Sequence, residues 1–403
     1  MQRGRDVSAE VPRIIVDDTG RALGDFARWY RHRVEALIVG VTGSVGKTTT
    51  RDMLQAVLSA RHSGRSSLKN FNNEVGLPLS LLELKAGDEF GVMEMGAARI
   101  GDIRSLCQIA DPEIGVITRI GPAHLATFGT LENIFQAKGE LLEALPQHGF
   151  AVVCGDDEQM RGLARRAKCR VLFAGERQNN EVRATDVDFR PGRLRFRVEG
   201  QSYEMAAPAR HYLTAALCAL AVAREIGMEP AAIAGGLMKF AGQPGRCTVE
   251  RSGEFTIIDD TYNASPLSMQ AACFTLRDWP AQHQRLLVVG DMLELGDESQ
   301  ACHRELGACV AAASLDRLLA FGNSASYVSS AALGAGMNPH TVAECSGIEA
   351  LLAVLDCWLE PGDVVLVKGS RGMRMERVVQ WLKQRSAGSR QENYTPPTAR
   401  AVA

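Results

Sequence analysis

The 403-residue sequence contains no apolar run approaching the roughly 18–20 residues that a membrane-spanning helix requires. Its first residues, MQRGRDVSAE, are polar and have no apolar core of the kind found in signal peptides. These two absences predict a soluble cytoplasmic protein that is not inserted in a membrane.

An excess of charge of either sign is also absent, since 45 Lys and Arg residues balance 47 Asp and Glu residues. A chain without a strong positive field does not attract nucleic acid over long distances, so we expect no nucleic-acid partner. Any anionic ligand must be bound by a local site. The hydrophobic content of 46% and the length are typical of a globular protein with two or three domains.

The ten cysteines occur singly, and the sequence has no C-x-x-C pair. Cys218 and Cys273, for example, lie in apolar segments with a helical pattern. The sequence therefore favours buried, reduced thiols over a zinc site or a disulfide framework.

The chain alternates between short apolar segments and helical patterns from about residue 36 onward. This alternation predicts a mostly parallel sheet covered by helices on both faces. Leu194, Phe196 and Val198 alternate with polar residues, which predicts an antiparallel meander attached to this sheet, and a helical hairpin follows. Gly and Pro residues at 242–245 mark the expected domain boundary, after which a second α/β series begins.

The predicted fold class is therefore α/β. We expect a central P-loop ATPase domain with a mostly parallel sheet at residues 36–243 and a Rossmann-like α/β C-terminal domain at 244–387. Residues 1–35 contain one expected strand and one expected helix (RIIVDDTGRALGDFARWYRHR), too little for a domain of their own. Residues 388–403 are polar and contain proline, and we expect a disordered tail.

The segment GVTGSVGKTTT, residues 40–50, follows a predicted strand and begins a predicted helix. In this layout backbone N–H groups and a helix N-terminus surround phosphate oxygens. Lys47 would reach the terminal phosphates, and the Thr48 hydroxyl would bind Mg²⁺. The strict motif has glycine where Val41 stands. A glycine-rich turn that contains lysine by chance is disfavoured, because strand, glycine spacing, Lys-Thr pair and helix coincide.

Three more polar residues, Glu94, His124 and Lys138, lie near the ends of predicted strands or inside a helix. Glu94 ends an apolar strand, where a carboxylate must be paired or bound to a metal, although it could equally cap the next helix. Taken alone, His124 is an ordinary loop histidine and Lys138 a solvated helix lysine.

In their order along the chain, the motifs resemble the Mur ligase family, and the resemblance extends over roughly residues 12–385. Within that family NFNNEVGLP, DDTYNASP and KGSRGMRMERV favour the MurF type over the MurE and folylpolyglutamate-synthase types. The family's loop pattern has an aliphatic residue at the position of Val41. The motifs are TGSVGKTTT, KNFNNEVGLPLSLLEL, MEMGA, GPAHLATFGTLENIFQAKGE, IDDTYNASPLSM, VVGDMLELGDES and VLVKGSRGMRMERVV.

The resemblance implies an ATP-dependent amide ligase of peptidoglycan precursor synthesis. ATP would phosphorylate the carboxylate of UDP-N-acetylmuramoyl-tripeptide, and the amine of D-alanyl-D-alanine would then displace phosphate from the acyl phosphate. The expected partners are these small molecules, and we expect the protein to be a monomer.

The resemblance also implies the nucleotide site, in which Arg246 would contact phosphate and Asp260 the ribose. Its members would be Thr42, Gly43, Ser44, Val45, Gly46, Lys47, Thr48, Thr49, His211, Arg246 and Asp260.

Two Mg²⁺ ions are implied, with Thr48, Glu94, His124 and Lys138 around them. Lys138 matches a lysine that the family carbamylates with CO₂, which would turn a cation that repels Mg²⁺ into an anion that binds it. The implied catalytic residues are Lys47, Glu94, His124, Lys138 and Arg246.

For the substrates, the resemblance assigns Asn72, Asn73 and Glu74 to a loop that faces the muramoyl-peptide. It assigns six further residues to C-terminal motifs: Tyr262, Asn263, Ser265, Lys368, Ser370 and Arg371. The segment that begins at Asn263 can equally form an Asx turn, which is compatible with binding. Because Arg246 and Asp260 lie beyond the 242–245 boundary, we expect the second domain to close against the first.

Two departures from the family pattern leave alternatives open. In HYLTA, Tyr212 and Ala215 stand where many members have asparagine, so adenine contacts would be rebuilt, for instance by stacking on Tyr212. The family's UDP-binding N-terminal domain is represented only by its last expected strand and helix. The alternatives are a related ligase with a different carboxylate acceptor and a catalytically inactive nucleotide-binding scaffold in cell-wall assembly.

Overall fold

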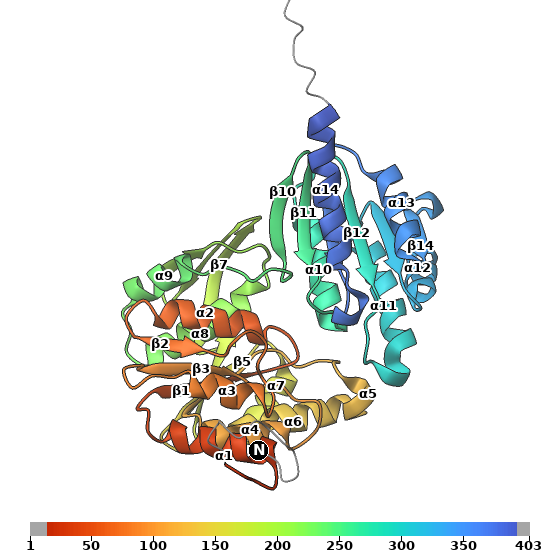
Figure 1. The fold of residues 1–403 in the computed structure, drawn as a ribbon. Helices are drawn as coiled ribbons and strands as arrows, with labels where there is room; N and C mark the ends of the chain where they lie inside the picture. Colours follow the sequence, from red (N-terminus) through yellow and green to blue (C-terminus); the bar gives the residue numbers. More distant parts are fainter. Residues whose placement is uncertain (1–13, 393–403) are drawn as a thin grey trace, which may run out of the picture. The chain divides into compact units, whose positions relative to one another are not determined.

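The computed structural model describes residues 14–392, with side chains up to Arg385. The chain divides between Ala241 and Gly242 into two compact units, each built around its own sheet (Figure 1). The division falls at the start of the Gly/Pro segment 242–245.

The first unit contains a nine-stranded sheet in the order β2-β3-β1-β4-β5-β6-β7-β8-β9 within the described residues. The pairs from β2 to β7 are parallel, and β7, β8 and β9 pair antiparallel. The predicted mostly parallel sheet and its antiparallel meander are therefore confirmed. The elements are α1 (Thr19–Arg31), β1 (Leu37–Thr42), α2 (Lys47–Leu58), β2 (Gly64–Ser66), α3 (Gly76–Leu82), β3 (Phe90–Glu94), α4 (Asp102–Ala110), β4 (Ile114–Ile117), α5 (Leu125–Phe128), α6 (Leu131–Ala144), β5 (Phe150–Cys154), α7 (Glu158–Ala164), β6 (Arg170–Gly175), β7 (Val182–Arg190), β8 (Arg193–Val198), β9 (Gln201–Met205), α8 (Tyr212–Glu225) and α9 (Pro230–Met238).

Helices cover both faces of this sheet, as the apolar strands require. Ile38, Val39 and Val41 of β1 are completely buried, which is typical of a central strand in a parallel sheet. Helices α2, α8 and α9 pack together, and α1, α3, α4 and α6 form the other layer (Figure 1).

Strand β1 lies between β3 and β4, with Val41 opposite Glu94 and Thr42 opposite Ile117. Because the three strands are parallel, their carboxyl ends meet at one edge of the sheet. The segments that carry the glycine-rich loop, Glu94 and His124 therefore begin side by side.

The second unit contains a six-stranded sheet in the order β10-β11-β15-β12-β13-β14 in the described part of the chain. Only β10 and β11 pair antiparallel there; the other neighbours are parallel, which confirms the predicted α/β class. Helices α13 and α14 bury Leu351, Leu355, Val378 and Leu382 against one face. The elements are β10 (Thr248–Ser252), β11 (Phe255–Asp260), α10 (Pro266–Asp278), β12 (Arg285–Gly290), η1 (Gly296–Glu298), α11 (Ser299–Ala312), β13 (Arg317–Phe321), α12 (Ala325–Gly334), η2 (Pro339–Thr341), β14 (Val342–Cys345), α13 (Ile348–Trp358), β15 (Val364–Lys368), η3 (Arg371–Met373) and α14 (Glu376–Glu392).

Two sequence expectations at the ends of the chain differ from the structure. The strand expected before α1 is wrong in its described part: Ile14 and Ile15 are irregular and 81% and 66% exposed, and Val16 forms only a single bridge. Arg13, also in that expectation, lies outside the described residues. Helix α14 continues to Glu392, so regular structure extends past residue 388, where a tail was expected; residues 393–403 are not described.

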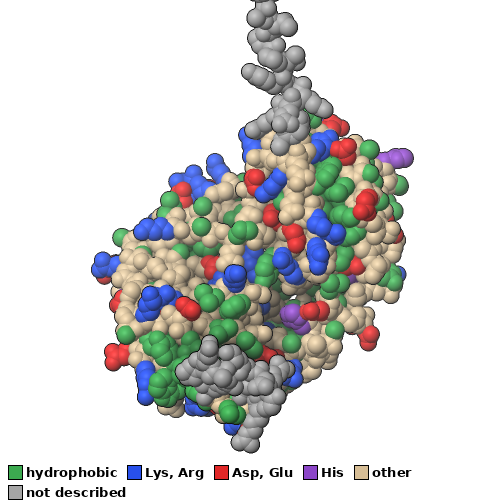
Figure 2. Space-filling model, in the orientation of Figure 1, with side chains coloured by type: hydrophobic (Ala, Val, Ile, Leu, Met, Phe, Trp, Pro, Cys, Tyr) green, Lys and Arg blue, Asp and Glu red, His purple; other side chains and the backbone are tan. Residues whose placement is uncertain are grey.

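The surface agrees with the near-zero formal net charge of −2. Figure 2 shows Lys and Arg side chains interspersed with Asp and Glu side chains over the face that it draws. The ligands must therefore be bound by local features of each unit.

Candidate active site

The glycine-rich loop between β1 and α2 needs glycine for two different reasons. Gly43 has φ +149°, and a Cβ atom there would lie 2.1 Å from the Thr118 hydroxyl oxygen. Gly46 has φ +86°, in the left-handed region that favours glycine. Val41 needs neither property, because its side chain is buried in the sheet. The glycine missing from the strict motif therefore costs this loop nothing.

The N–H groups of Ser44 and Val45 are hydrogen-bonded within the protein. Both donate to the carbonyl of Arg119, at 2.7 and 3.4 Å. The assignment of Ser44 and Val45 to the nucleotide site therefore stays a prediction, in which these two amides would have to exchange the Arg119 carbonyl for phosphate. An anion here would instead meet the N–H groups of the first turn of α2, where the helix dipole adds positive potential.

Lys47, the first residue of α2, lies over this loop. Its Nζ donates to the carbonyl of Gly43 at 2.8 Å and to that of Ser44 at 3.4 Å. The ammonium group is thus held beside the start of α2, where an arriving phosphate would meet it.

Glu94 is the centre of a buried hydrogen-bonded cluster, and its side chain is 2% exposed. Oε2 accepts from the Thr48 hydroxyl at 2.8 Å and lies 3.3 Å from Nη1 of Arg51. Oε1 accepts from the Asn72 amide at 2.9 Å. The carboxylate therefore joins the phosphate loop to the Asn72 segment. It is paired, as its position at the end of an apolar strand requires.

Glu140, rather than Glu94, binds the N-terminus of the next helix. This buried carboxylate of α6 accepts from the N–H groups of Gly101 at 2.7 Å and Arg104 at 3.0 Å. The alternative role of Glu94 as a helix cap is thus wrong. Sequence reasoning missed Glu140 because an acidic residue in a helix usually faces solvent.

Lys138 of α6 is 3% exposed, which contradicts its interpretation as a solvated helix lysine. Burial, reinforced by the charge of Lys47, lowers its pKa to about 7, although Asp102, Glu140 and Glu94 act in the opposite direction. A lysine with this pKa is partly neutral at physiological pH, and only a neutral amine reacts with CO₂.

His124 lies at the start of α5, with φ +54° in the left-handed region. Its carbonyl accepts from the N–H groups of Thr127 and Phe128, which begins the short helix. The ring of Phe128 lies 5.9 Å from Lys138 Nζ, so α5 connects the His124 segment to the buried lysine.

The described residues contain no group of three or more His, Cys, Asp or Glu side chains arranged to hold a metal ion. The oxygens of Thr48 and Glu94, 2.8 Å apart, are nonetheless of the hard type that Mg²⁺ prefers. Lys138 would add such oxygens only as a carbamate. Thr48 and Glu94 therefore fit magnesium when ligand phosphate oxygens complete the coordination.

Asn73 and Glu74, the other two residues predicted to face the muramoyl-peptide, differ from Asn72 in their surroundings. The side-chain oxygen of Asn73 accepts from the N–H groups of Val75 at 3.3 Å and Gly76 at 2.9 Å, which begins α3. Glu74 is exposed. Among the three predicted residues, the structure thus brings Asn72 to Glu94.

His211 and Tyr212 open α8 with different surroundings. His211 is exposed, whereas Tyr212 is 2% exposed and packs edge-on against Phe240, with ring centroids 5.9 Å apart. The suggestion that adenine stacks on Tyr212 is wrong in this conformation, because that ring is part of the core.

In the second unit, Tyr262 gathers two predicted arginines. The guanidinium carbon of Arg246 lies 3.9 Å from the centroid of its ring, and that of Arg371 lies 5.9 Å away. Because both guanidinium groups lie near the Tyr262 ring, they could contact the same anionic ligand.

Asp260 and Lys368 end the paired strands β11 and β15 and form a partly buried ion pair. Lys368 Nζ donates to Asp260 Oδ2 at 2.6 Å and to the Asn263 carbonyl at 2.9 Å.

The two predicted serines of the second unit have local contacts. Ser265 belongs to the capping box of α10, and the Ser370 hydroxyl accepts from the N–H of Leu293.

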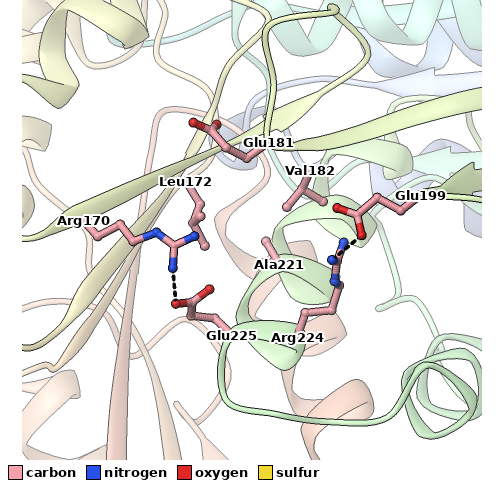
Figure 3. Close-up of a pocket in the computed structure, with 8 residues that line it drawn as sticks. All are labelled: Arg170, Leu172, Glu181, Val182, Glu199, Ala221, Arg224 and Glu225. Atoms are coloured by element: carbon pink, nitrogen blue, oxygen red, sulfur yellow. Dashed lines mark hydrogen bonds and ion pairs between the residues drawn. The ribbon is translucent and has the colours of Figure 1, made fainter.

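A separate pocket of about 160 Å³ lies in the first unit, where the meander meets α8 (Figure 3). It holds two ion pairs of 2.6 Å each, Arg170 with Glu225 and Arg224 with Glu199. Because both arginines of the lining are paired with a lining glutamate and the lining includes none of the predicted site residues, we regard these pairs as structural. The lining residues are Arg170, Leu172, Glu181, Val182, Glu199, Ala221, Arg224 and Glu225.

Comparison with known proteins identifies the family of this chain. The family model of the Mur ligase middle domain matches residues 41–223, and that of the Mur ligase glutamate ligase domain matches residues 245–371. The UDP-N-acetylmuramoyl-tripeptide–D-alanyl-D-alanine ligase of Bacillus subtilis is 34% identical over 370 residues, which cover 91% of this chain and 80% of the relative. The chain belongs to the Mur ligase family.

Other Mur ligases of the MurF type are similarly close. The Escherichia coli ligase of the same name is 33% identical, with 94% of this chain and 84% of that protein covered. A crystal structure of MurF from Acinetobacter baumannii superimposes with a TM-score of 0.85 at 31% identity, covering 94% of this chain and 84% of that one. MurF from Thermotoga maritima in complex with ADP gives 0.84 at 30% identity, covering 96% and 88%. The predicted resemblance to this family and type is confirmed.

Proposed function

We propose that this Mur ligase joins D-alanyl-D-alanine to UDP-N-acetylmuramoyl-tripeptide at the expense of ATP, in peptidoglycan precursor synthesis. Its relatives at 33–34% identity carry the name of this activity, and a structural neighbour binds ADP. The observation within the chain that carries the proposal is the Glu94 carboxylate, to which Thr48 of the phosphate loop and Asn72 of the acceptor loop both donate.

The chemistry consists of two displacements. An oxygen of the acceptor carboxylate attacks the γ-phosphorus of ATP, which gives an acyl phosphate and ADP. The amine of the dipeptide then attacks the acyl carbon, the amide bond forms, and inorganic phosphate leaves with that carboxylate oxygen while the amine loses a proton. The protein's task is to align the reactants and to balance the charge.

ATP phosphates would be held by the first turn of α2 and by Lys47, which already lies over the loop. The remaining nucleotide contacts are proposals from the family resemblance: His211, which is exposed, Arg246 to phosphate and Asp260 to ribose. Asp260 would have to exchange or share its partner Lys368 when it does so.

Magnesium would be held by Thr48 and Glu94 together with phosphate oxygens, and a second ion by Glu94, His124 and a carbamate on Lys138. When bound, these ions would neutralise the phosphate and carboxylate charges that otherwise repel one another. The carbamate is supported by the buried amine of Lys138, whose pKa of about 7 makes it available to CO₂.

The acceptor peptide would be bound by Asn72, Asn73 and Glu74. We propose that six residues of the second unit bind the dipeptide and take part when the units close around the substrates: Tyr262, Asn263, Ser265, Lys368, Ser370 and Arg371.

No helix in the described part of the chain is long and apolar enough to cross a membrane. We place the reaction in the cytoplasm because its substrates are ATP and a nucleotide-linked precursor, and a monomer stays our expectation.

The proposal is tested by phosphate release in the presence of Mg-ATP, UDP-N-acetylmuramoyl-tripeptide and D-alanyl-D-alanine. We expect release only when both the acceptor and the dipeptide are present, and a loss of at least a hundredfold in Lys47→Ala. Lys85→Ala, an exposed lysine of the same unit, is the matched control and keeps full activity. Absence of dipeptide-dependent release would favour a different acceptor or an inactive scaffold.

A further inference from the structure

Arg51 is a buried cation outside every motif considered above. It lies on α2, one helical turn after Lys47, and it is 1% exposed. A charged side chain this deeply buried must be paired, and its partners indicate what it does.

The guanidinium group of Arg51 contacts three different segments. Nε and Nη2 donate to Oδ1 of Asp52 at 2.8 and 2.6 Å. Nη1 lies 3.3 Å from Oε2 of Glu94 and also donates to the carbonyl of Lys69. Arg51 therefore connects the helix that follows the phosphate loop to the carboxylate cluster and to the backbone of the segment before Asn72.

The segment from Ser67 to Val75, which we call the acceptor loop, is otherwise fastened to the end of β3. The N–H of Glu94 donates to the Ser67 hydroxyl at 2.9 Å, and the N–H of Gly96 donates to the Asn72 carbonyl at 2.7 Å. A Cβ atom on Gly96 would lie 2.8 Å from the Asn72 side chain, so the loop lies close against the strand end.

Between these two attachments the loop is held in an unusual conformation. Lys69 has φ +45°, in the left-handed region that lysine rarely adopts, and it is the Lys69 carbonyl that Arg51 binds. Such a backbone persists only when surrounding contacts maintain it. Arg51 supplies such a contact from the helix that begins at the phosphate loop.

We propose that Arg51 is a positioning residue for acceptor binding: it fixes the Lys69 backbone and the Glu94 carboxylate, and through them places Asn72. The inference rests on the proposed function, which assigns the acceptor loop to the muramoyl-peptide. Lysine cannot replace arginine here, since its single ammonium group cannot present the planar set of donors that reaches Asp52, Glu94 and Lys69 together.

The test compares Arg51→Lys with the wild type in steady-state kinetics and ADP binding. We expect the KM for the acceptor to rise at least tenfold while the Kd for ADP, measured without Mg²⁺ because Glu94 is a proposed magnesium ligand, changes less than twofold. Arg65→Lys is the matched control, because Arg65 forms a 2.7 Å ion pair with Asp88 in the same unit. That control should leave both constants within twofold of the wild type.

A readout without substrates uses amide hydrogen exchange in the acceptor loop of the unliganded protein. We expect exchange at residues 68–72 to be at least tenfold faster in Arg51→Lys and unchanged in Arg65→Lys. Equal exchange and equal acceptor KM in the variant and the wild type would overturn the proposal. A loss of ADP affinity as large as the loss of acceptor affinity would also overturn it, since Arg51 would then support the nucleotide site as much as the acceptor loop.

A second variant and a wild-type reference complete the test of Arg51. If circular dichroism shows that Arg51→Lys is unfolded, Arg51→Gln is measured in the same way. Amide exchange at residues 68–72 of the wild type that is as fast as exchange at Gly192, in the exposed turn after β7, would contradict a fixed loop. If the wild type shows no dipeptide-dependent phosphate release, the proposed function fails, while the exchange experiment still decides whether Arg51 holds the loop.

Discussion

Lys138 shows how the surroundings of one residue change its chemistry. In the sequence it is an ordinary lysine in a helix, but the fold buries it beside Lys47, and its pKa falls to about 7. The negative charges of Asp102, Glu140 and Glu94 raise this pKa and partly offset the effect of burial. The result is an amine that exists partly in the neutral form at physiological pH.

This shift predicts a pH-dependent stability. Below about pH 7 Lys138 is protonated in both states, and the cost of burying the cation is fully present. Between pH 7 and the ordinary lysine pKa the unfolded state binds more protons, so the free energy of unfolding rises with pH. Relative to Lys138→Met, the wild type should gain up to about 1.4 kcal/mol per pH unit.

Urea unfolding from pH 7 to 9 in CO₂-free buffer measures this difference. The exposed Lys85→Met serves as the control and should follow the wild type at every pH. Wild-type and Lys138→Met stabilities that run parallel across this range would contradict the account.

The sequence predicted where several residues of the site lie but not which side chains they contact. Glu94 was expected at a strand end from the apolar run before it, and Val41 in the sheet. The contacts of Glu94 with Arg51 and Asn72 depend on how α2 and the acceptor loop pass the strand, which no local pattern specifies. Tyr212 illustrates the same limit, because its burial depends on Phe240, 28 positions away in the sequence.

Helices α4 and α6 are connected by a buried carboxylate, that of Glu140. The Glu140 carboxylate of α6 accepts from two N–H groups at the start of α4, where the helix dipole favours an anion. This contact fixes the helix that carries Lys138. It also explains why α6 tolerates a buried acid two residues after a buried lysine.

Replacing Glu140 by Gln should weaken this junction. A glutamine oxygen can accept from one N–H, but its amide group faces the other donor, so the free energy of unfolding should fall by about 1–3 kcal/mol. Glu143→Gln on the same helix is the control, because Glu143 is 36% exposed and should change stability by less than about 1 kcal/mol. Chemical denaturation that gives equal losses for both variants would contradict the assigned role of Glu140.

The elements themselves were largely predictable, because both sheets consist of continuous apolar strands separated by helical patterns. The failures have a physical cause. Ile14 and Ile15 read as a strand, yet they remain exposed in the described structure and so gain nothing from burial. Short polar strands such as β2 and β10 have no apolar pattern and form because a neighbouring strand offers hydrogen bonds.

For the whole molecule, the proposed reaction draws on residues of both units: Lys47, Glu94 and Lys138 from the first, Arg246 and Asp260 from the second. We therefore predict that the units move relative to one another when the substrates bind. Small-angle scattering should show a smaller radius of gyration with a non-hydrolysable ATP analogue, Mg²⁺ and the acceptor than without ligand. Identical scattering curves in the two conditions would contradict domain closure.

We propose that this Mur ligase activates the acceptor carboxylate by transferring phosphate to it. The most direct test supplies acceptor labelled with ¹⁸O in that carboxylate, together with Mg-ATP and D-alanyl-D-alanine, and determines the mass of the released phosphate. Because phosphate leaves with the carboxylate oxygen, we expect one ¹⁸O atom in each phosphate released in the presence of the dipeptide. Phosphate that carries no label, or a yield that does not depend on the dipeptide, would contradict it.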